Sequence, residues 1–558
     1  MKKYAVYLAT AALALSAALP GRATRSKKVD VARNLEIFNE VVKQIQMAYV
    51  DSIDIEKAIN TAIDAMLSDL DPYTEYMPRK EQTEFRTMTT GEYGGIGSYI
   101  RQTPRGTIIA GPQENSPAAI AGLKAGDLIL TIDGDTVTGL TNDKVSERLK
   151  GTPGTHVNVR VIRPFVEDSI LDFDIERKKI TNPAVPYYGV THDNIGYIAL
   201  TGFNEKSGDE VKAALQSLTA NPEVKGLILD LRGNVGGLLE EAVEIVGYFV
   251  PKGTEVLRTR GKGVLNEKIY RTTSRPIVSA DMPLVVLVDG GTASSSEITA
   301  GALQDLDRAV IAGSRSFGKG LVQTTYSMPY EGMLKVTTAK YYIPSGRLIQ
   351  AIDYSHRNPD GSAGRIPDSL TNEFTTANGR KVRDGGGIVP DVKVDYPDIS
   401  RLTYNVVRDN WAADYAMKYA ATHPTIAAPE EFVITDEIYE GFKESIDSAR
   451  FNYDKVCEQM LKNLREAAKV EGYMNDSVSA EFDRLNAMLK HSLSHDLDAN
   501  RSSIEPYLAR EIIGLYYYTK GEIMNSLKKD PGVDAAAAVL KDPARYRELL
   551  SPKAVKAD

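Results

Sequence analysis

The chain has 558 residues, enough for about three or four domains at roughly 150 residues per domain. Hydrophobic residues make up 42%, charged residues 25% and aromatic residues 8%, which excludes a disordered tail, a collagen-like fibre and a polytopic membrane protein. The net charge is −8, but residues 1–28 hold six Lys or Arg and no acid, so the rest of the chain carries −14. An acidic body disfavours nucleic acid as a partner, because phosphate binding needs a concentrated basic surface.

Residues 1–28 have the pattern of an export signal. Two lysines precede an apolar run from Tyr4 to Leu19, which ends at Pro20, Gly21 and a basic cluster. We therefore predict an exported, periplasmic protein. The segment is either a cleaved signal peptide or an uncleaved anchor in the inner membrane, and a buried N-terminal helix is the alternative.

Two segments follow with different patterns. Residues 29–87 show apolar residues at three- and four-residue steps, which predicts helices. Residues 88–180 show short strands separated by glycines, with helical stretches around 118–123 and 142–149. The second segment is therefore a compact, strand-rich module.

Strands alternate with helices over residues 181–400, which predicts an α/β core built from βαβ units, and a long hairpin (LVQTTYSM, then MLKVTTAKYYIP) lies within it. Residues 401–558 have a helical pattern. The single cysteine, Cys457, lies there, and its helical context favours a packed core thiol over a reactive one.

The stretch PLVVLVDGGTASSSEITAGALQDL predicts a buried strand, a Gly-Gly turn and a helix that begins at Ser294. A serine at a helix N-terminus lies beside unpaired backbone N–H groups, which can stabilise a developing oxyanion. Ser294 to Glu297 also spells S-x-x-E, a capping box, so a purely structural role for this serine is the alternative.

A serine hydroxyl needs a base to act as a nucleophile, and none of the six histidines lies beside a recognisable turn motif. Lys319 lies in a glycine-flanked turn (RSFGKGLVQ), where desolvation would lower its pKa, and Gln323 could hold its amine. An exposed turn lysine is the alternative. The turn also spells G-x-x-x-x-G-K, but Gly320 replaces the required Ser or Thr and a strand follows, so nucleotide binding is disfavoured.

The stretch LILDLRGNVGGLLEEA repeats the theme of strand, glycine-rich turn and helix. Its Gly236 and Gly237 would let the backbone approach a substrate closely, and an ordinary βα turn is the alternative. The sequence shows no H-x-x-x-H and no clustered cysteines, so we predict no metal and no cofactor.

Together these stretches resemble the C-terminal processing (tail-specific) proteases, a family of exported, PDZ-containing serine proteases with a Ser–Lys dyad. The matching pieces follow the order of the family: MLSDLDPYTEYM, GEYGGIG, SPAAIAGLKAGDLILTIDG, IGYIALTGF, LILDLRGNVGG, GTASSSEITAGALQD, GKGLVQ and GGIVPDV. The resemblance implies a multidomain α/β protein with a ClpP/crotonase-like protease core. The implied parts are a signal peptide or anchor (1–28), an N-terminal helical segment (29–87), an inserted PDZ domain (88–180), the serine protease core (181–400) and a helical C-terminal extension (401–558).

Carried over residue by residue, the resemblance makes Ser294 the nucleophile, Lys319 the general base and Gln323 the partner that orients the lysine. The oxyanion hole would be formed by the backbone N–H groups of Ser295 and Gly236. The neighbouring Ser296 is the rival nucleophile.

The resemblance also implies that Gly95, Ile96 and Gly97 form the PDZ carboxylate loop. This loop would take the C-terminal carboxylate of a substrate while the substrate adds as a strand, with a preference for apolar C-terminal side chains.

The expected activity is that of a serine endopeptidase that recognises substrate C-termini and cleaves through an acyl-enzyme. The expected partners are polypeptides with apolar C-termini, an adaptor protein and further copies of this chain in a homodimer or higher oligomer. The alternatives are a non-catalytic PDZ scaffold on a protease fold and a Ser–His–Asp hydrolase. The latter would need G-x-S-x-G where this chain reads G-T-A-S-S-S.

Overall fold

The computed structural model describes residues 27–164, 169–191, 193–263, 267–451, 456–490 and 492–552, in two compact units divided between Tyr76 and Met77. The predicted export signal lies almost entirely outside these residues. Within the described ranges, no helix combines the length and the apolar character needed to cross a membrane.

The described part of the first unit contains two helices, α2 Lys27–Ala48 and α3 Ile55–Ser68, as the apolar spacing predicts. Asp54 caps α3, because its carboxylate accepts the N–H of Lys57 at 3.0 Å. Several apolar side chains of α2 are exposed, among them Leu35 at 64%. Strand β1 Glu75–Met77 spans the boundary between the two units.

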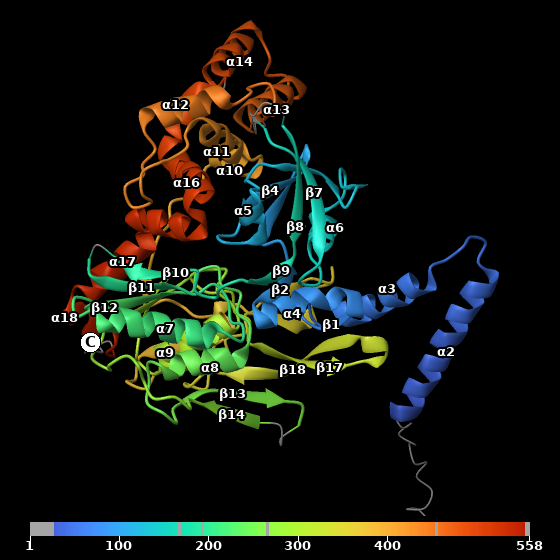
Figure 1. Ribbon diagram of the computed structural model, residues 1–558, viewed down its shortest axis with the longest axis vertical. Helices are drawn as coiled ribbons and strands as arrows, with labels where there is room; N and C mark the ends of the chain where they lie inside the picture. The colour runs from blue at the N-terminus through green and yellow to red at the C-terminus, as the bar shows by residue number, and fades with distance from the viewer. Residues whose placement is uncertain are drawn as a thin grey trace, which may run out of the picture. The chain divides into compact units, whose positions relative to one another are not determined.

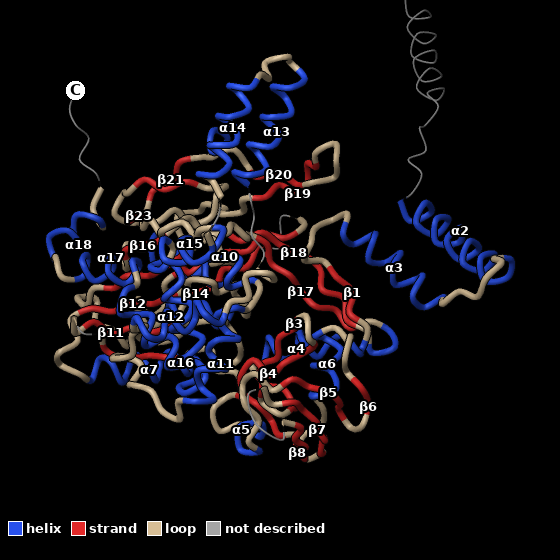
Figure 2. The backbone as a smooth tube through the Cα atoms, turned by 90° about the horizontal axis from the view of Figure 1, so that it is seen from above, coloured by secondary structure: helices blue, strands red, loops and turns tan. Residues whose placement is uncertain are grey.

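The second unit opens with η1 Arg79–Glu81 and α4 Gln82–Thr90 and continues into a small antiparallel sheet. Its strands run in the order β3-β4-β5-β7-β8, which lie together in Figure 2, and β2 pairs with β9. The bounds are β2 Glu92–Gly95, β3 Ser98–Thr103, β4 Gly106–Pro112, β5 Leu128–Ile132, β6 Asp135–Thr136, β7 His156–Ile162, β8 Ile170–Glu176, β9 Lys178–Thr181, α5 Pro117–Ala121 and α6 Asn142–Leu149. Both predicted helical stretches are therefore present, and β3 is an edge strand.

A six-stranded sheet forms the core of the unit, in the order β10-β11-β12-β15-β16-β23. Only β10 is antiparallel to its neighbour in this sheet. The bounds are β10 Tyr187–Val190, β11 Ile195–Ala199, β12 Gly226–Asp230, β15 Leu284–Val288, β16 Val310–Gly313, β23 Val392–Lys393, α7 Ser207–Ala220, α8 Leu239–Gly247 and α9 Ser295–Asp305. Strands covered on both faces read as continuous apolar runs, and every residue of β15 (LVVLV) is buried.

Figure 1 shows α7, α8 and α9 on one side of this sheet and α17 on the other. Beside the core, a second sheet contains the predicted hairpin, in which β17 Leu321–Ser327 pairs antiparallel with β18 Met333–Tyr342. Lys319 therefore precedes a strand rather than a helix, which confirms that the G-x-x-x-x-G-K stretch lacks the context of a phosphate-binding loop. The remaining elements are β13 Glu255–Gly261, β14 Glu267–Arg271, η2 Pro329–Glu331, β19 Ile352–Arg357, β20 Ala363–Arg365, η3 Asp368–Leu370, β21 Glu373–Thr375 and β22 Lys381–Arg383.

The C-terminal part of the chain is helical, as predicted. Its bounds are α10 Arg401–Arg408, α11 Trp411–Thr422, α12 Asp436–Ser445, α13 Val456–Val470, α14 Asp476–Met488, α15 Leu493–Ala499, α16 Arg501–Ser526, η4 Leu527–Lys529, α17 Pro531–Leu540 and α18 Pro543–Leu549. Helices α10, α11, α12, α15 and α16 share a hydrophobic core of their own. Helices α17 and α18 instead pack on the six-stranded sheet, with Val533, Leu540 and Tyr546 in its second core cluster.

The prediction for Cys457 is wrong, because its side chain is exposed in α13. This helix packs against α14 and buries only Leu461 among its described residues. A helical pattern predicts burial only where a second layer covers the helix, and Cys457 lies on an uncovered side.

Candidate active site

The predicted nucleophile lies where β15 passes into α9. Ser294 is the N-cap residue of α9 and has φ 56° and ψ −117°, a backbone conformation that L-residues rarely adopt. Such strain costs about 1–3 kcal/mol and persists only where surrounding contacts impose it. Here the neighbouring turn of residues 231–237 imposes it, since the Ala293 N–H donates to Asn234 O at 3.0 Å and the Ser296 hydroxyl to the same oxygen at 2.8 Å.

Burial distinguishes the three consecutive serines. Ser295 and Ser296 are 1% and 0% exposed, and their hydroxyls donate to the carbonyls of Gly237 and Asn234. Ser294 is the member of the run that is partly exposed. An attacking hydroxyl must reach a substrate, so the geometry favours Ser294 over its rival Ser296.

A buried carboxylate ties the serine turn to the lysine turn. Glu297 Oε2 accepts the N–H of Ser294 at 3.0 Å and the N–H of Lys319 at 2.8 Å. Its Oε1 accepts the N–H of Gly318 at 2.7 Å and the hydroxyl of Ser316. Burial raises the pKa of Glu297, although these four hydrogen bonds oppose the shift by stabilising the charged form. The predicted capping glutamate therefore fixes two turns at once.

A second side chain bridges the same two turns. The Tyr341 hydroxyl, on β18, donates to Lys319 O at 2.8 Å and lies 3.3 Å from Ser294 O. Burial raises the pKa of Tyr341 well above its usual value, and the charge of Glu297 adds to the effect. This tyrosine therefore stays protonated and acts as a donor.

Lys319 is partly buried, and the turn that holds it requires a glycine at position 318. Gly318 has φ 90°, and a Cβ there would lie 2.3 Å from Ala351 Cβ. Gln323, four residues along the hairpin, donates from Nε2 to Thr337 Oγ1 at 3.1 Å. This contact leaves the carbonyl oxygen of the Gln323 amide as the acceptor suited to an amine.

The two residues of the predicted oxyanion hole lie against each other. Gly236 has φ 97°, and a Cβ there would lie 2.8 Å from each of Ala293 O, Ser294 Cβ and Ser295 N. Ser295 is the first residue of α9, so its N–H has no acceptor within the helix. The Gly236 N–H donates to Asn234 Oδ1 at 2.9 Å, a local contact that the sequence did not predict.

The predicted carboxylate loop belongs to the small antiparallel sheet, between β2 and the edge strand β3. Ile96 is 2% exposed, and its carbonyl accepts the N–H of Ala118 at 2.8 Å. Gly97 has φ 71°, and a Cβ there would lie 2.5 Å from Ser116 Cβ, so glycine is required. Contacts thus join Ser294, Ser295, Gly236 and the backbone of Lys319 into one group, and residues 95–97 form a second group at this loop.

Two contributors to the first group escaped sequence reasoning. Tyr341 carries no motif, and the contacts of Glu297 with residues 316–319 form only when the lysine turn folds against the start of α9. Within the described ranges, no three His, Cys, Asp or Glu side chains cluster in a way that could hold a metal ion.

A strained serine at a helix N-terminus, braced against a lysine turn, is an arrangement suited to a serine hydrolase. Segments of the chain also match known protein families. Residues 194–360 match "Peptidase family S41", 108–163 match a PDZ domain, 402–540 match "Probable PDZ-protease, C-terminal helical domain" and 4–81 match the "Activating protease CtpB N-terminal domain".

Individual relatives are also similar to this chain. A carboxy-terminal-processing protease of Bartonella bacilliformis is 38% identical over 59% of this chain and 75% of its own length. A probable CtpA-like serine protease of Staphylococcus haemolyticus is 29% identical over 78% of this chain and 86% of its own length. Among solved structures, a photosystem II D1 C-terminal processing protease is 28% identical, with a TM-score of 0.35 over 63% of this chain and 86% of that chain.

This chain therefore belongs to peptidase family S41, the carboxy-terminal-processing proteases. It is a serine-type peptidase with a PDZ domain and a helical C-terminal domain, and the predicted fold class and enzyme class are confirmed.

Proposed function

We propose that this chain is an exported endopeptidase that cleaves polypeptides through a Ser294–Lys319 dyad. The observation that carries the proposal is the Glu297 carboxylate, which accepts the backbone N–H groups of both residues. A buried group that holds two turns from separate segments in register is suited to fixing a nucleophile relative to its base.

In this mechanism the neutral amine of Lys319 accepts the hydroxyl proton as Ser294 attacks the scissile carbonyl. Gln323 orients the amine through its amide oxygen. The N–H groups of Ser295 and Gly236 stabilise the tetrahedral oxyanion, and the Gly236 N–H shares its bond to Asn234 with the developing charge. Lys319 then protonates the leaving amine, and water hydrolyses the acyl-enzyme.

Substrate selection is assigned to the PDZ domain. The N–H groups of residues 95–97 receive a C-terminal carboxylate, and the substrate tail pairs with the edge strand β3. We expect apolar C-terminal side chains to be preferred. An adaptor protein that delivers substrates is part of the same proposal.

Export and assembly belong to the proposal as well. The basic and apolar pattern of residues 1–28 supports export to the periplasm, by a cleaved signal or with an anchor in the inner membrane. The exposed apolar side chains of α2 support a homodimer or higher oligomer.

The test compares the exported chain with its Ser294→Ala and Lys319→Ala variants on an unfolded protein with an apolar C-terminus. Lys340→Ala, on β18 and exposed, is the matched control for removal of a lysine. We expect cleavage by the parent and the control alone, and slower cleavage when an acidic tail is added to the substrate. Cleavage by Ser294→Ala would move the nucleophile elsewhere, and a folded parent without cleavage would favour the non-catalytic scaffold.

A further inference from the structure

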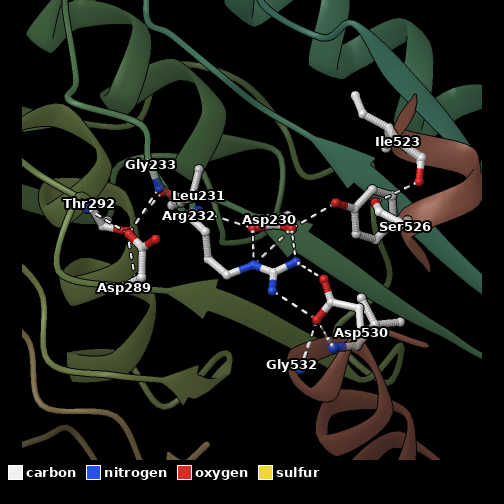
Figure 3. A network of polar contacts seen from close by, with 12 residues as sticks. Asp230, Leu231, Arg232, Gly233, Asp289, Thr292, Ile523, Ser526, Asp530 and Gly532 are labelled. Atoms are coloured by element: carbon white, nitrogen blue, oxygen red, sulfur yellow. Dashed lines mark hydrogen bonds and ion pairs between the residues drawn. The ribbon is translucent and has the colours of Figure 1, made fainter. Parts of the chain in front are cut away.

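A largely buried ion network joins the start of helix α17 to the glycine turn beside Ser294 (Figure 3). The Arg232 guanidinium, 17% exposed, donates from Nη1 and Nη2 to the two carboxylate oxygens of Asp530, each at 2.8 Å. Its Nε and Nη2 contact Asp230, at 3.0 and 2.6 Å. The contact with Asp530 is bidentate, a geometry that fixes direction as well as distance.

Asp530 is itself anchored. It is the N-cap residue of α17, and its Oδ1 accepts the N–H groups of Gly532 at 2.8 Å and Val533 at 3.1 Å. Helix α17 packs on β12, β15 and β16 of the core sheet. A Cβ on Gly532 would lie 2.9 Å from Arg232 Nη1, so this helix end and the arginine are in close contact.

The other end of the network is the turn that follows Arg232. The Gly233 N–H donates to Asp289 Oδ1 at 2.9 Å, and Asn234 O accepts the Ala293 N–H at 3.0 Å. Three residues beyond Gly233, Gly236 lies against the Ser294 turn. The turn of residues 231–237 is thus held by the serine segment on one side and, through its own Arg232, by Asp530 on the other.

The position of the Arg232 guanidinium depends on the two carboxylates that pair with it, those of Asp230 and Asp530. Two carboxylates face one guanidinium, and the Tyr197 hydroxyl donates to Asp230 Oδ2 at 2.7 Å. Burial alone would lower the pKa of Arg232, but the charges of Asp230 and Asp530 and their hydrogen bonds outweigh it and raise the pKa. Removing one carboxylate from such a buried network leaves the arginine incompletely paired.

We propose that Asp530 is a positioning residue of the proteolytic site, which acts through Arg232 to hold the turn that presents the Gly236 N–H. The inference rests on the proposed function and deepens it, because it gives helix α17 of the C-terminal domain a part in positioning the proteolytic site. Asp530 and Arg232 are 298 residues apart in sequence.

The perturbation is Asp530→Asn in the full chain. Asparagine is as good an N-cap as aspartate, so α17 keeps its cap, while one of the two oxygens that face the guanidinium becomes an amide donor. The matched control is Asp542→Asn. Asp542 caps α18 through the N–H groups of Ala544 and Arg545, at 3.0 and 2.9 Å, and each aspartate is followed by proline.

Two measurements are made on both variants. On an unstructured peptide with an apolar C-terminus, we expect Asp530→Asn to lower kcat about 10-fold or more with KM within about twofold, because misplacing one oxyanion donor is costly. By hydrogen exchange, we expect faster exchange of the amides of residues 233–238 in Asp530→Asn only. Arg232→Gln should lower kcat similarly, and adding Asp530→Asn to it should cause no further loss.

Equal kcat values for Asp530→Asn and Asp542→Asn would overturn the proposal, as would full additivity with Arg232→Gln. The exchange measurement separates this inference from the proposed function. Unchanged exchange in Asp530→Asn refutes the positioning role even in an active enzyme. A parent that does not cleave, but whose turn loosens in Asp530→Asn, supports the positioning role and counts against the dyad.

Discussion

Replacing Glu297 by glutamine tests whether one buried carboxylate aligns the serine and lysine turns. The carboxylate accepts four hydrogen bonds, two at each oxygen. A glutamine amide has one acceptor oxygen, so its NH₂ group must face two of these donors. The Ser316 hydroxyl can rotate away, but the backbone N–H groups of Ser294, Gly318 and Lys319 cannot. At least one buried N–H therefore loses its partner.

The size of the effect follows from these contacts. An unpaired buried N–H costs about 1–3 kcal/mol, and the surviving bonds fall from charge-assisted to neutral strength, with the relief of a buried charge as a partial offset. We expect a net loss of about 3 kcal/mol in the free energy of unfolding. Because an error of about 1 Å in positioning costs about 10²-fold in rate, we expect kcat to fall by about that factor.

The pH dependence has a defined sign. Burial raises the pKa of Glu297 above its ordinary value of 4.5, so the folded chain holds this proton more tightly than the unfolded chain. The resulting contribution to stability is complete below pH 4.5 and is lost as the pH rises through the folded pKa. The advantage of the parent over Glu297→Gln in unfolding free energy should therefore shrink as the pH rises across this window.

The assay combines denaturant unfolding with steady-state cleavage of the peptide substrate. Glu241→Gln is the matched control, because this partly buried glutamate on α8 accepts one backbone N–H, that of Gly208, at 2.8 Å. We expect the control to lose about 1 kcal/mol and to keep its kcat. If Glu297→Gln is folded and its kcat lies within about threefold of the parent, then the Glu297 carboxylate does not align the serine and lysine turns.

Three further predictions follow from the same geometry. Gly236→Ala should abolish measurable cleavage, because its Cβ would meet three atoms of the serine turn at 2.8 Å, whereas Gly253→Ala, which shares a positive φ but has open space, should stay active in the same assay. Tyr341→Phe removes the donor to the carbonyl of the predicted base, so kcat should fall about 10-fold and unfolding free energy by about 1–2 kcal/mol, and unchanged kinetics would exclude this bridge. Asp127→Asn breaks the buried ion pair with Arg163 in the PDZ domain, and we expect the free energy of unfolding of this domain to fall by about 3–5 kcal/mol and the preference for apolar tails to be lost. If the variant keeps both this stability and this preference, the assignment of tail selection to the PDZ domain is contradicted.

Local pattern was sufficient for much of the fold. Runs such as LVVLV predict strands buried on both faces, and the S-x-x-E stretch predicts a helix that starts at Ser294; both are present. The hairpin after Lys319 was equally legible from its alternating residues. These predictions succeeded because period, capping and turn chemistry act over a few residues.

The site was only partly predictable for the opposite reason. The sequence predicted Ser294 as the nucleophile with Ser296 as its rival, and the structure adds that Ser296 is buried under the glycine turn whereas Ser294 is partly exposed. Cys457 was predicted to be packed and is exposed, because no second layer covers its side of α13. Whether a side chain is buried or exposed depends on which surfaces pack together, and the sequence of one segment does not specify that.

The amino-acid sequence by itself therefore determined the class of this protein, and it supplied the predicted order of its parts and the turns on which the proposed chemistry rests, since motifs and local propensities depend on neighbouring residues. Only the tertiary structure decided how those turns are held. Glu297 and Tyr341 join segments that lie far apart in the chain, and Asp530 reaches Arg232 across 298 residues. Contacts between residues so far apart in sequence follow from the packing of helices and strands against one another, and no local sequence pattern indicates that packing.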